Sequence, residues 1–179
     1  MLDFVSPWSA LSSGGQQIGT VDGLELAIQT RTWPSANAAI TYPFRLSRDK
    51  LLSALYYFMG GSQSGNIDLG IYTADGVRLI STGSVAAGTV NILHVLDVTD
   101  LVLPAGDYLA AMAASSATLQ IMGQTLAGFT SGAFMLARGA GSILQHSTAM
   151  PLPAAFSETG VGADRVLAFG PIFHPSTTI

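Results

Sequence analysis

The sequence contains no cysteine, which excludes disulfide bonds, thiolate zinc sites and catalytic thiols. Charge is also scarce: Asp, Glu, Lys and Arg make up 10% of the residues, against about 25% in an ordinary soluble domain. Lys50 is the only lysine, and the arginines are scattered singly along the chain. With a net charge of −4, the chain offers no basic footprint for nucleic acid and no polybasic segment for a membrane surface.

Apolar residues, by contrast, are abundant, at 49% of the chain, and the mean hydropathy is +0.45. The longest stretch without charge, from Tyr108 to Ala137, is interrupted by Ser, Thr, Gln and Gly, so we expect no membrane insertion. A charge-poor surface favours association. We therefore expect a homo-oligomer, although a monomeric β-domain coated with Ser and Thr remains the alternative.

The first residues differ in character from the rest of the 179-residue chain. Residues 1–22 contain Pro7, Trp8 and a Ser-Ser-Gly-Gly run, and they lack the basic and apolar regions of a signal peptide. Such a segment needs a partner to hold it in place. We interpret residues 1–22 as an N-terminal arm that docks to a neighbour, and residues 23–179 as a single β-sandwich domain.

From residue 24 onward the hydrophobic pattern has the period of two that is typical of half-buried strands. Ile67, Leu69 and Ile71, for example, alternate with Asp68, Gly70 and Tyr72. Residues 50–59 fit either a helix face or a strand, and their adjacent aromatic residues favour a strand. Eight to ten such segments and no sustained helical period predict an all-β fold, an antiparallel sandwich that is jelly-roll-like.

Two turns are predicted to determine this fold. Asp75-Gly76 is a strong hairpin signal, because these residues tolerate the positive φ angles that tight turns need. Pro104 and Gly106 are predicted to belong to a turn, Pro104-Ala105-Gly106-Asp107, between the short strands of residues 101–114. Residues 137–164, rich in Gly, Ala, Ser and Pro, are expected to form a long loop excursion.

Candidate chemistry is weak. His94, His146 and His174 are isolated, which is a poor pattern for a metal site. Asp97 and Asp100 could supply two oxygens to calcium, but turn chemistry explains them better. We therefore expect no enzyme activity, no metal and no cofactor.

Aromatic residues are the other candidates for function. Trp8, Trp33 and Tyr72 are candidates for surface contact, for example by stacking on sugar rings. The alternative is that these rings anchor the core or an interface.

A resemblance to a known family rests on residues 50–122. Gly70-Ile71-Tyr72, Asp75-Gly76, Arg78-Leu79, the Ser81–Ser84 run and the Leu103–Leu109 segment resemble a hairpin and a following turn in β-sandwich proteins of tailed-bacteriophage virions. Those proteins are fibre-like, receptor-binding or decoration components.

The resemblance implies a structural protein located in the virion, in the tail, fibre or adsorption apparatus. It also implies homo-oligomeric assembly, in which trimers are common, and in some members attachment to host-surface glycans. Other virion proteins would bind through residues 1–22. A capsid decoration or head-fibre protein, or a carbohydrate-binding module, is the alternative. No catalytic residue is carried over, because the matched motif contains none.

Overall fold

The structure is a computed structural model that describes residues 3–4, 29–125, 144–146, 149–156, 161–162 and 165–174. Within these ranges every regular element is a strand, which confirms the prediction of an all-β fold. The strands are β1 (Asp3–Phe4), β2 (Gln29–Thr32), β3 (Ala39–Leu46), β4 (Lys50–Phe58), β5 (Asn66–Thr73), β6 (Arg78–Ser81), β7 (Val85–Ala86), β8 (Leu93–Leu103), β9 (Gly106–Ala114), β10 (Gln120–Thr125), β11 (Leu144–His146), β12 (Val161–Gly162), β13 (Arg165–Leu167) and β14 (Phe169–Phe173).

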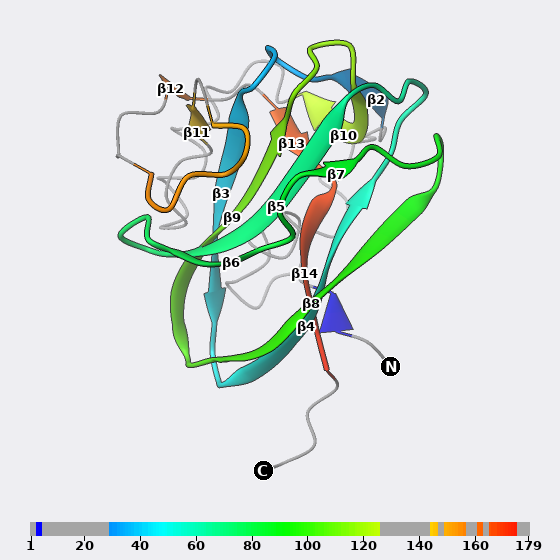
Figure 1. The fold of residues 1–179 in the computed structure, drawn as a ribbon. Helices are drawn as coiled ribbons and strands as arrows, with labels where there is room; N and C mark the ends of the chain where they lie inside the picture. The colour runs from blue at the N-terminus through cyan, green and yellow to red at the C-terminus, as the bar shows by residue number, and fades with distance from the viewer. Residues whose placement is uncertain are drawn as a thin grey trace, which may run out of the picture.

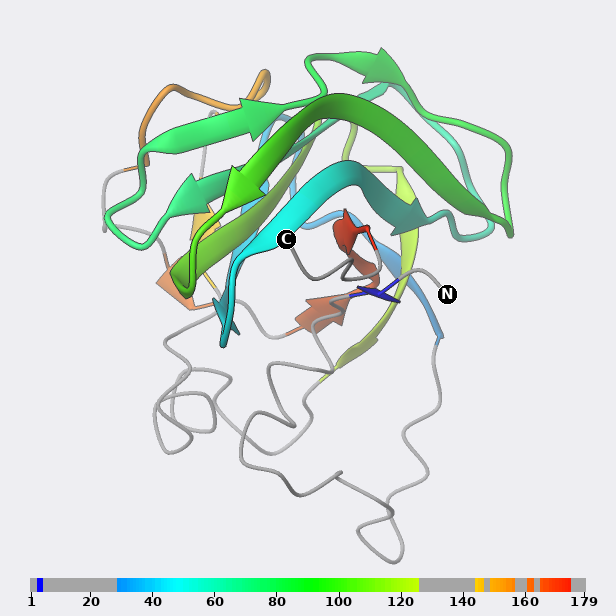
Figure 2. The same ribbon diagram turned by 90° about the horizontal axis from the view of Figure 1, so that it is seen from below.

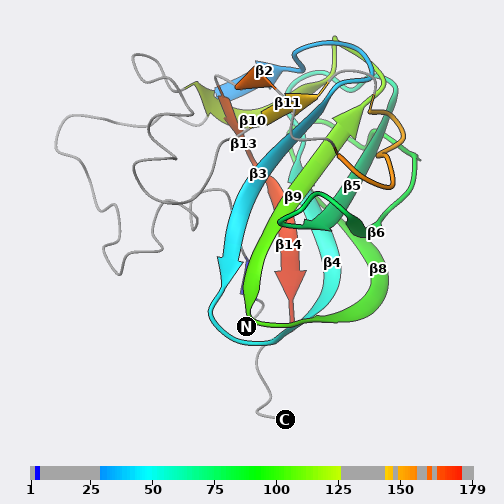
Figure 3. The same ribbon diagram turned by 90° about the vertical axis from the view of Figure 1, so that its left-hand side faces the viewer.

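The strands form two main sheets and one small sheet (Figure 1). The first main sheet has the order β1-β14-β4-β8, and the second has the order β12-β11-β3-β9-β5-β6, with β7 also paired to β5. The third sheet, β13-β10-β2, is an addition at one end. Strands β3, β9 and β5 run side by side in one layer, with β14 and β4 behind them (Figure 3).

The pairing follows the jelly-roll scheme of two four-stranded antiparallel sheets. Four pairs of strands form ladders, namely β1 with β14, β3 with β9, β4 with β8, and β5 with β6. Within each pair the two strands lie in the same sheet, and successive pairs alternate between the two main sheets until the β5–β6 turn. The predicted antiparallel, jelly-roll-like sandwich is thus confirmed.

The register shows that the central part of this fold is one long hairpin. Ala39 pairs with Ala113, Lys50 with Leu103, and Gly70 with Ser81. Each pair lies about equally far on either side of the β5–β6 turn. The strand pairing from Ala39 to Ala114 is therefore organised around a single turn, the one at Asp75-Gly76.

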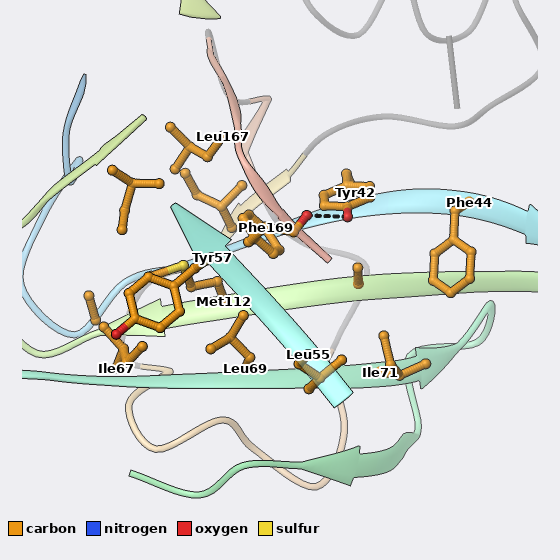
Figure 4. Close-up of a cluster of buried hydrophobic side chains, with 14 of the residues drawn as sticks. Tyr42, Phe44, Leu55, Tyr57, Ile67, Leu69, Ile71, Met112, Leu167 and Phe169 are labelled. Carbon is orange, nitrogen blue, oxygen red and sulfur yellow. Dashed lines mark hydrogen bonds between the residues drawn. The ribbon is translucent and has the colours of Figure 1, made fainter. Parts of the chain in front are cut away.

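The core lies between the two main sheets and explains the alternating pattern. Ile67, Leu69 and Ile71 of β5 are fully buried and face Leu55 and Tyr57 of β4 (Figure 4). The Tyr42 hydroxyl donates a hydrogen bond to the Phe169 carbonyl oxygen and so joins the two sheets.

Several local predictions can be compared with these strands. Residues 50–59 form β4, as the aromatic residues indicated, and not a helix. Pro43 lies in the part of β3 that pairs only with β9 among the described residues, and a proline is tolerated at such an edge position. Of the β pattern expected from residue 24 onward, residues 29–32 form β2, whereas residues 24–28 lie outside the described residues. Residues 1–2 and 5–22 of the predicted arm also lie outside them, and β1 is the described part of that arm.

Candidate functional site

The β5–β6 turn is the first candidate, because most of the family resemblance lies around it. The Gly76 nitrogen donates to the Thr73 carbonyl oxygen at 2.9 Å, and the Thr73 nitrogen donates to the Val77 carbonyl oxygen at 2.9 Å. Gly76 has a φ of 82°, whereas Asp75 is not among the residues with positive φ. The connection is therefore a three-residue loop that ends in a left-handed glycine, and only Gly76 needs the freedom that the sequence suggested for both residues.

A segment from the predicted loop excursion covers this turn. Residues 149–156, called the strap here, cross the outer face of the second sheet (Figure 1, orange). The Phe156 nitrogen donates to the Gly76 carbonyl oxygen at 2.8 Å, and the Arg78 nitrogen donates to Ala154 at 2.9 Å. The turn is thus held by backbone hydrogen bonds from a segment some eighty residues away in the sequence.

Asp68 fixes the middle of the strap. Its side chain is 1% exposed, and it accepts a hydrogen bond of 2.9 Å from the Leu152 nitrogen and one of 3.3 Å from the Thr82 hydroxyl. The Arg78 side chain donates to the Leu152 carbonyl oxygen. A buried carboxylate needs such donors. Asp68 therefore has a structural role, which we call a pin: it holds Leu152 of the strap against the sheet.

The strap also changes the interpretation of the aromatic candidates. Tyr72 is 0% exposed; its ring packs against Phe156 with centroids 4.7 Å apart, and its hydroxyl donates to the Pro153 carbonyl oxygen at 2.7 Å. Burial raises the pKa of this hydroxyl, while the nearby Arg78 charge lowers it. β5 is therefore buried on both faces, and the expectation that Tyr72 contacts a partner at the surface is wrong.

Trp33 is likewise a core residue and not a surface one. It is 2% exposed, and its indole nitrogen donates to the Ala38 carbonyl oxygen at 3.1 Å. The alternative of a core anchor is the correct one for this residue. The third candidate, Trp8, lies outside the described residues.

The second predicted turn, between β8 and β9, is present. The Tyr108 hydroxyl donates to the Pro104 carbonyl oxygen at 2.8 Å, and the Ala105 nitrogen donates to Asp49 at 2.9 Å. Gly106 has no positive φ, and a Cβ there would meet the Tyr108 ring at an ordinary 3.8 Å. Gly106 is therefore not required to be glycine, which corrects its predicted role as a fold determinant.

Two of the histidines, His94 and His146, and the acidic residue Asp107 have structural contacts. The His94 ring stacks on Tyr57 at 4.8 Å, and His146 contacts the Thr41 hydroxyl at 3.1 Å. Burial lowers the pKa of His146. The two carboxylate oxygens of Asp107 accept hydrogen bonds from the Arg45 guanidinium, at 2.6 and 2.7 Å, in a bidentate ion pair. Among the described residues, no group of three or more His, Asp or Glu side chains is placed to hold a metal ion.

The exposed apolar side chains form the remaining candidate surface. Six large hydrophobic residues of the described ranges are exposed, by 40% to 53% of their side chains: Val77, Leu79, Ile92, Leu93, Val95 and Val102. All six lie on β6 or β8, or directly before them, and these strands are the ends of their sheets. We call Val77, Arg78 and Leu79 the tip patch, and Ile92, Leu93, Val95 and Asp97 the β8 patch.

The sequence of β8 contains a signal for this surface. In β8 the exposed Leu93 and Val95 alternate with the partly buried His94 and Leu96, so both faces of the strand are apolar. An apolar strand of this kind is normally covered on both sides. Here Leu93 and Val95 are exposed, so the described residues leave the outer face of β8 uncovered.

Comparisons of the chain with protein-family models, with curated proteins and with solved structures found no match. No helix within the described residues is long and apolar enough to span a membrane.

Proposed function

We propose that this chain is a structural subunit of a tailed-bacteriophage particle, located in the virion at the tail, fibre or adsorption apparatus, and that it acts by assembly. The observation that carries the proposal is the distribution of exposed apolar residues. All of the large ones in the described ranges lie on, or directly before, the edge strands β6 and β8 of a charge-poor jelly roll. Exposed apolar edges promote contact with another chain.

The positions that carry the resemblance support the same proposal. Gly70, Tyr72 and Gly76 build the turn end of the long hairpin, and the Leu103–Leu109 segment forms the turn between β8 and β9. These residues shape the sandwich and its edges, as expected for a subunit whose task is packing. They contribute no reacting group.

We further propose that the chain acts without catalysis. Three of the described acidic residues are engaged in structural contacts: Asp68 holds the strap, Asp107 pairs with Arg45, and Asp49 accepts a hydrogen bond from the Ala105 nitrogen. Each of these contacts holds a turn or a segment in place.

A carbohydrate-binding module has less support than assembly. Stacking on sugars needs an exposed aromatic face, and every tryptophan and tyrosine of the described ranges is buried. A glycan array with the folded protein tests attachment separately. Specific binding would add host-glycan recognition to the proposed function.

The test is to find the chain in a particle. Phage particles are purified from the source that encodes the chain, and their proteins are identified by mass spectrometry. We expect peptides of this chain in the intact particle, and immunogold labelling at the tail. Gold at the head would favour the decoration alternative, and the absence of the chain from purified particles would contradict the proposal.

The docking role proposed for residues 1–22 has its own test. A variant lacking these residues loses β1, which pairs with β14 through only Asp3 and Phe4, so we expect the sandwich to stay folded. We expect incorporation into particles to be lost. Incorporation at the normal level would show that the arm does not anchor the subunit.

A further inference from the structure

The two exposed apolar patches lie far apart on the molecule. The β5–β6 hairpin, which carries the tip patch, projects to one side, and β8 begins on the opposite side (Figure 1). The view from below shows the same separation, with the hairpin turn at the left and the start of β8 at the right (Figure 2). A single chain therefore cannot bring its own two patches together.

The patches also differ in charge. In the tip patch, Arg78 lies between Val77 and Leu79, and all three residues are exposed. The acidic Asp75 lies on the turn, two residues before Val77. The β8 patch ends in exposed Asp97, with Asp100 further along the strand. From Leu79 to Ala137 the sequence contains no lysine and no arginine, so β8 itself carries only acidic charge. A contact between two β8 patches would bring like charges together, whereas a tip patch offers β8 a cation. Arg78 is exposed, although one of its guanidinium nitrogens donates to the Leu152 carbonyl oxygen of its own chain.

From this separation and charge difference we propose that copies of this chain associate head to tail, with the tip patch of one copy seated against the β8 patch of the next. Val77 and Leu79 pack on Leu93 and Val95, and Arg78 faces Asp97 of the neighbouring copy. The contact joins two different surfaces, so it is heterologous. Repetition produces a closed ring where the rotation closes, and a filament where it does not.

The geometry of the edge strands fits this arrangement. Both patches lie on strands at the ends of their sheets. The backbone of Gly76 and Arg78 is already hydrogen-bonded to the strap, so the proposed contact is made by side chains and not by strand addition. A bulge between Ile71 and Tyr72 leaves Leu79 as the extra residue of β6, opposite no residue of β5. This displacement places an apolar side chain at the edge of the sheet. The proposal rests on the self-assembly part of the function proposed above, and it identifies the tip patch and the β8 patch as the surfaces through which copies bind one another.

The absence of cysteine permits a direct cross-linking test. Two single variants, Leu79→Cys and Val95→Cys, are co-expressed with different affinity tags and oxidised, and the products are separated on a non-reducing gel. A head-to-tail contact gives a covalent dimer that carries both tags. Each variant oxidised alone gives no such dimer, because Leu79 does not meet Leu79 and Val95 does not meet Val95.

A control pair uses Thr118→Cys, an exposed position outside both patches, in place of Val95→Cys, and we expect no cross-link. Efficient cross-linking of Val95→Cys with itself would show a two-fold contact and overturn the proposal. So would a folded oligomer that gives no mixed dimer, or a protein that remains monomeric. The cross-linking experiment uses purified protein, so its outcome is independent of the search for the chain in particles. If the chain is present in particles but no mixed dimer forms, only the head-to-tail contact is contradicted. If the mixed dimer forms but the chain is absent from particles, only the virion role is contradicted.

Discussion

Gly76 lies directly against the carbonyl group of Phe156: a Cβ added to Gly76 would stand 2.6 Å from the Phe156 carbonyl oxygen. The same glycine accepts a hydrogen bond from the Phe156 nitrogen at 2.8 Å. The tip of the long hairpin and the end of the strap are therefore in backbone contact, with no room for a side chain between them. This contact links the β5–β6 turn to the strap. The sequence indicates the turn, but it does not indicate that the strap packs there.

The first prediction concerns three glycines in different environments. Gly76→Ala adds both a positive-φ penalty and a backbone clash, and we expect a loss of at least about 2 kcal/mol in unfolding free energy. Gly83 has a φ of 68° but open space around it, so Gly83→Ala should cost only the φ penalty of about 1 kcal/mol. Gly106→Ala should change stability by less than about 0.5 kcal/mol.

Urea unfolding of the three variants measures these differences. The expected order of destabilisation is Gly76→Ala, then Gly83→Ala, then Gly106→Ala. Equal losses at Gly76 and Gly83 would show that the contact with Phe156 is not tight, and a large loss at Gly106 would restore its predicted role in the turn.

The second prediction compares two aspartates. Asp68→Ala leaves the Leu152 nitrogen without its acceptor in a buried position, and we expect a cost of about 1–3 kcal/mol. Asp107→Ala breaks an ion pair between side chains that are 69% and 52% exposed, which is worth less than about 1 kcal/mol. Thermal unfolding distinguishes the two, and an Asp68 variant as stable as the Asp107 variant would contradict the role of Asp68 as a pin.

The third prediction is a pH dependence that arises from His146. Burial holds its pKa below the ordinary 6.5, so near this pH the unfolded chain binds a proton more readily than the folded chain. The stability contribution is therefore complete above about pH 6.5 and is lost as the pH falls toward the folded pKa. We expect the melting temperature to fall between pH 7 and pH 5.

The variant His146→Gln should flatten this fall, because it removes the titrating group. His174→Gln is the matched control, since His174 is exposed, and it should leave the pH profile unchanged. A His146→Gln profile that follows the unmodified protein would assign the acid sensitivity to other groups.

Local features of this fold could be predicted from the sequence, and long-range ones could not. The alternation of Ile67, Leu69 and Ile71 is a property of adjacent residues, and the structure places all three in the core as expected. Tyr72 follows the same alternation, which suggests an exposed side chain. It is buried because the strap lies over it, and no local pattern indicates where residues 149–156 pack.

The two turns also show that the sequence predicts local features but not long-range contacts. Asp75-Gly76 predicts a turn because its chemistry is local, but the tight contact that leaves no room for a side chain at Gly76 comes from Phe156. Pro104 and Gly106 have the composition of a turn that needs a left-handed glycine, yet Gly106 has no positive φ. Composition gives the position of a turn more reliably than it gives the backbone angles.

The fourth prediction concerns the exposed surface of β8. Val95 is 53% exposed and belongs to no buried cluster, so Val95→Asp should not destabilise the fold. If Val77 and Leu79 of a neighbouring copy pack on this side chain, the added charge must be desolvated in an apolar contact whose one cation, Arg78, already faces Asp97, which is costly. We expect an unchanged melting temperature and a weaker oligomer by at least a factor of ten in the dissociation constant. Thr99→Asp, which adds a charge to an exposed position of the same strand outside the β8 patch, is the matched control and should have a smaller effect.

The central claim is that this chain functions by assembling with copies of itself, and size-exclusion chromatography with light scattering tests it most directly. At micromolar concentration we predict a discrete homo-oligomer with a mass that is a multiple of the 18.5 kDa chain, a trimer being the size that the resemblance to phage proteins implies. We also predict that Val95→Asp shifts this species toward the monomer. A stable, monodisperse monomer of 18.5 kDa at every concentration would contradict the account.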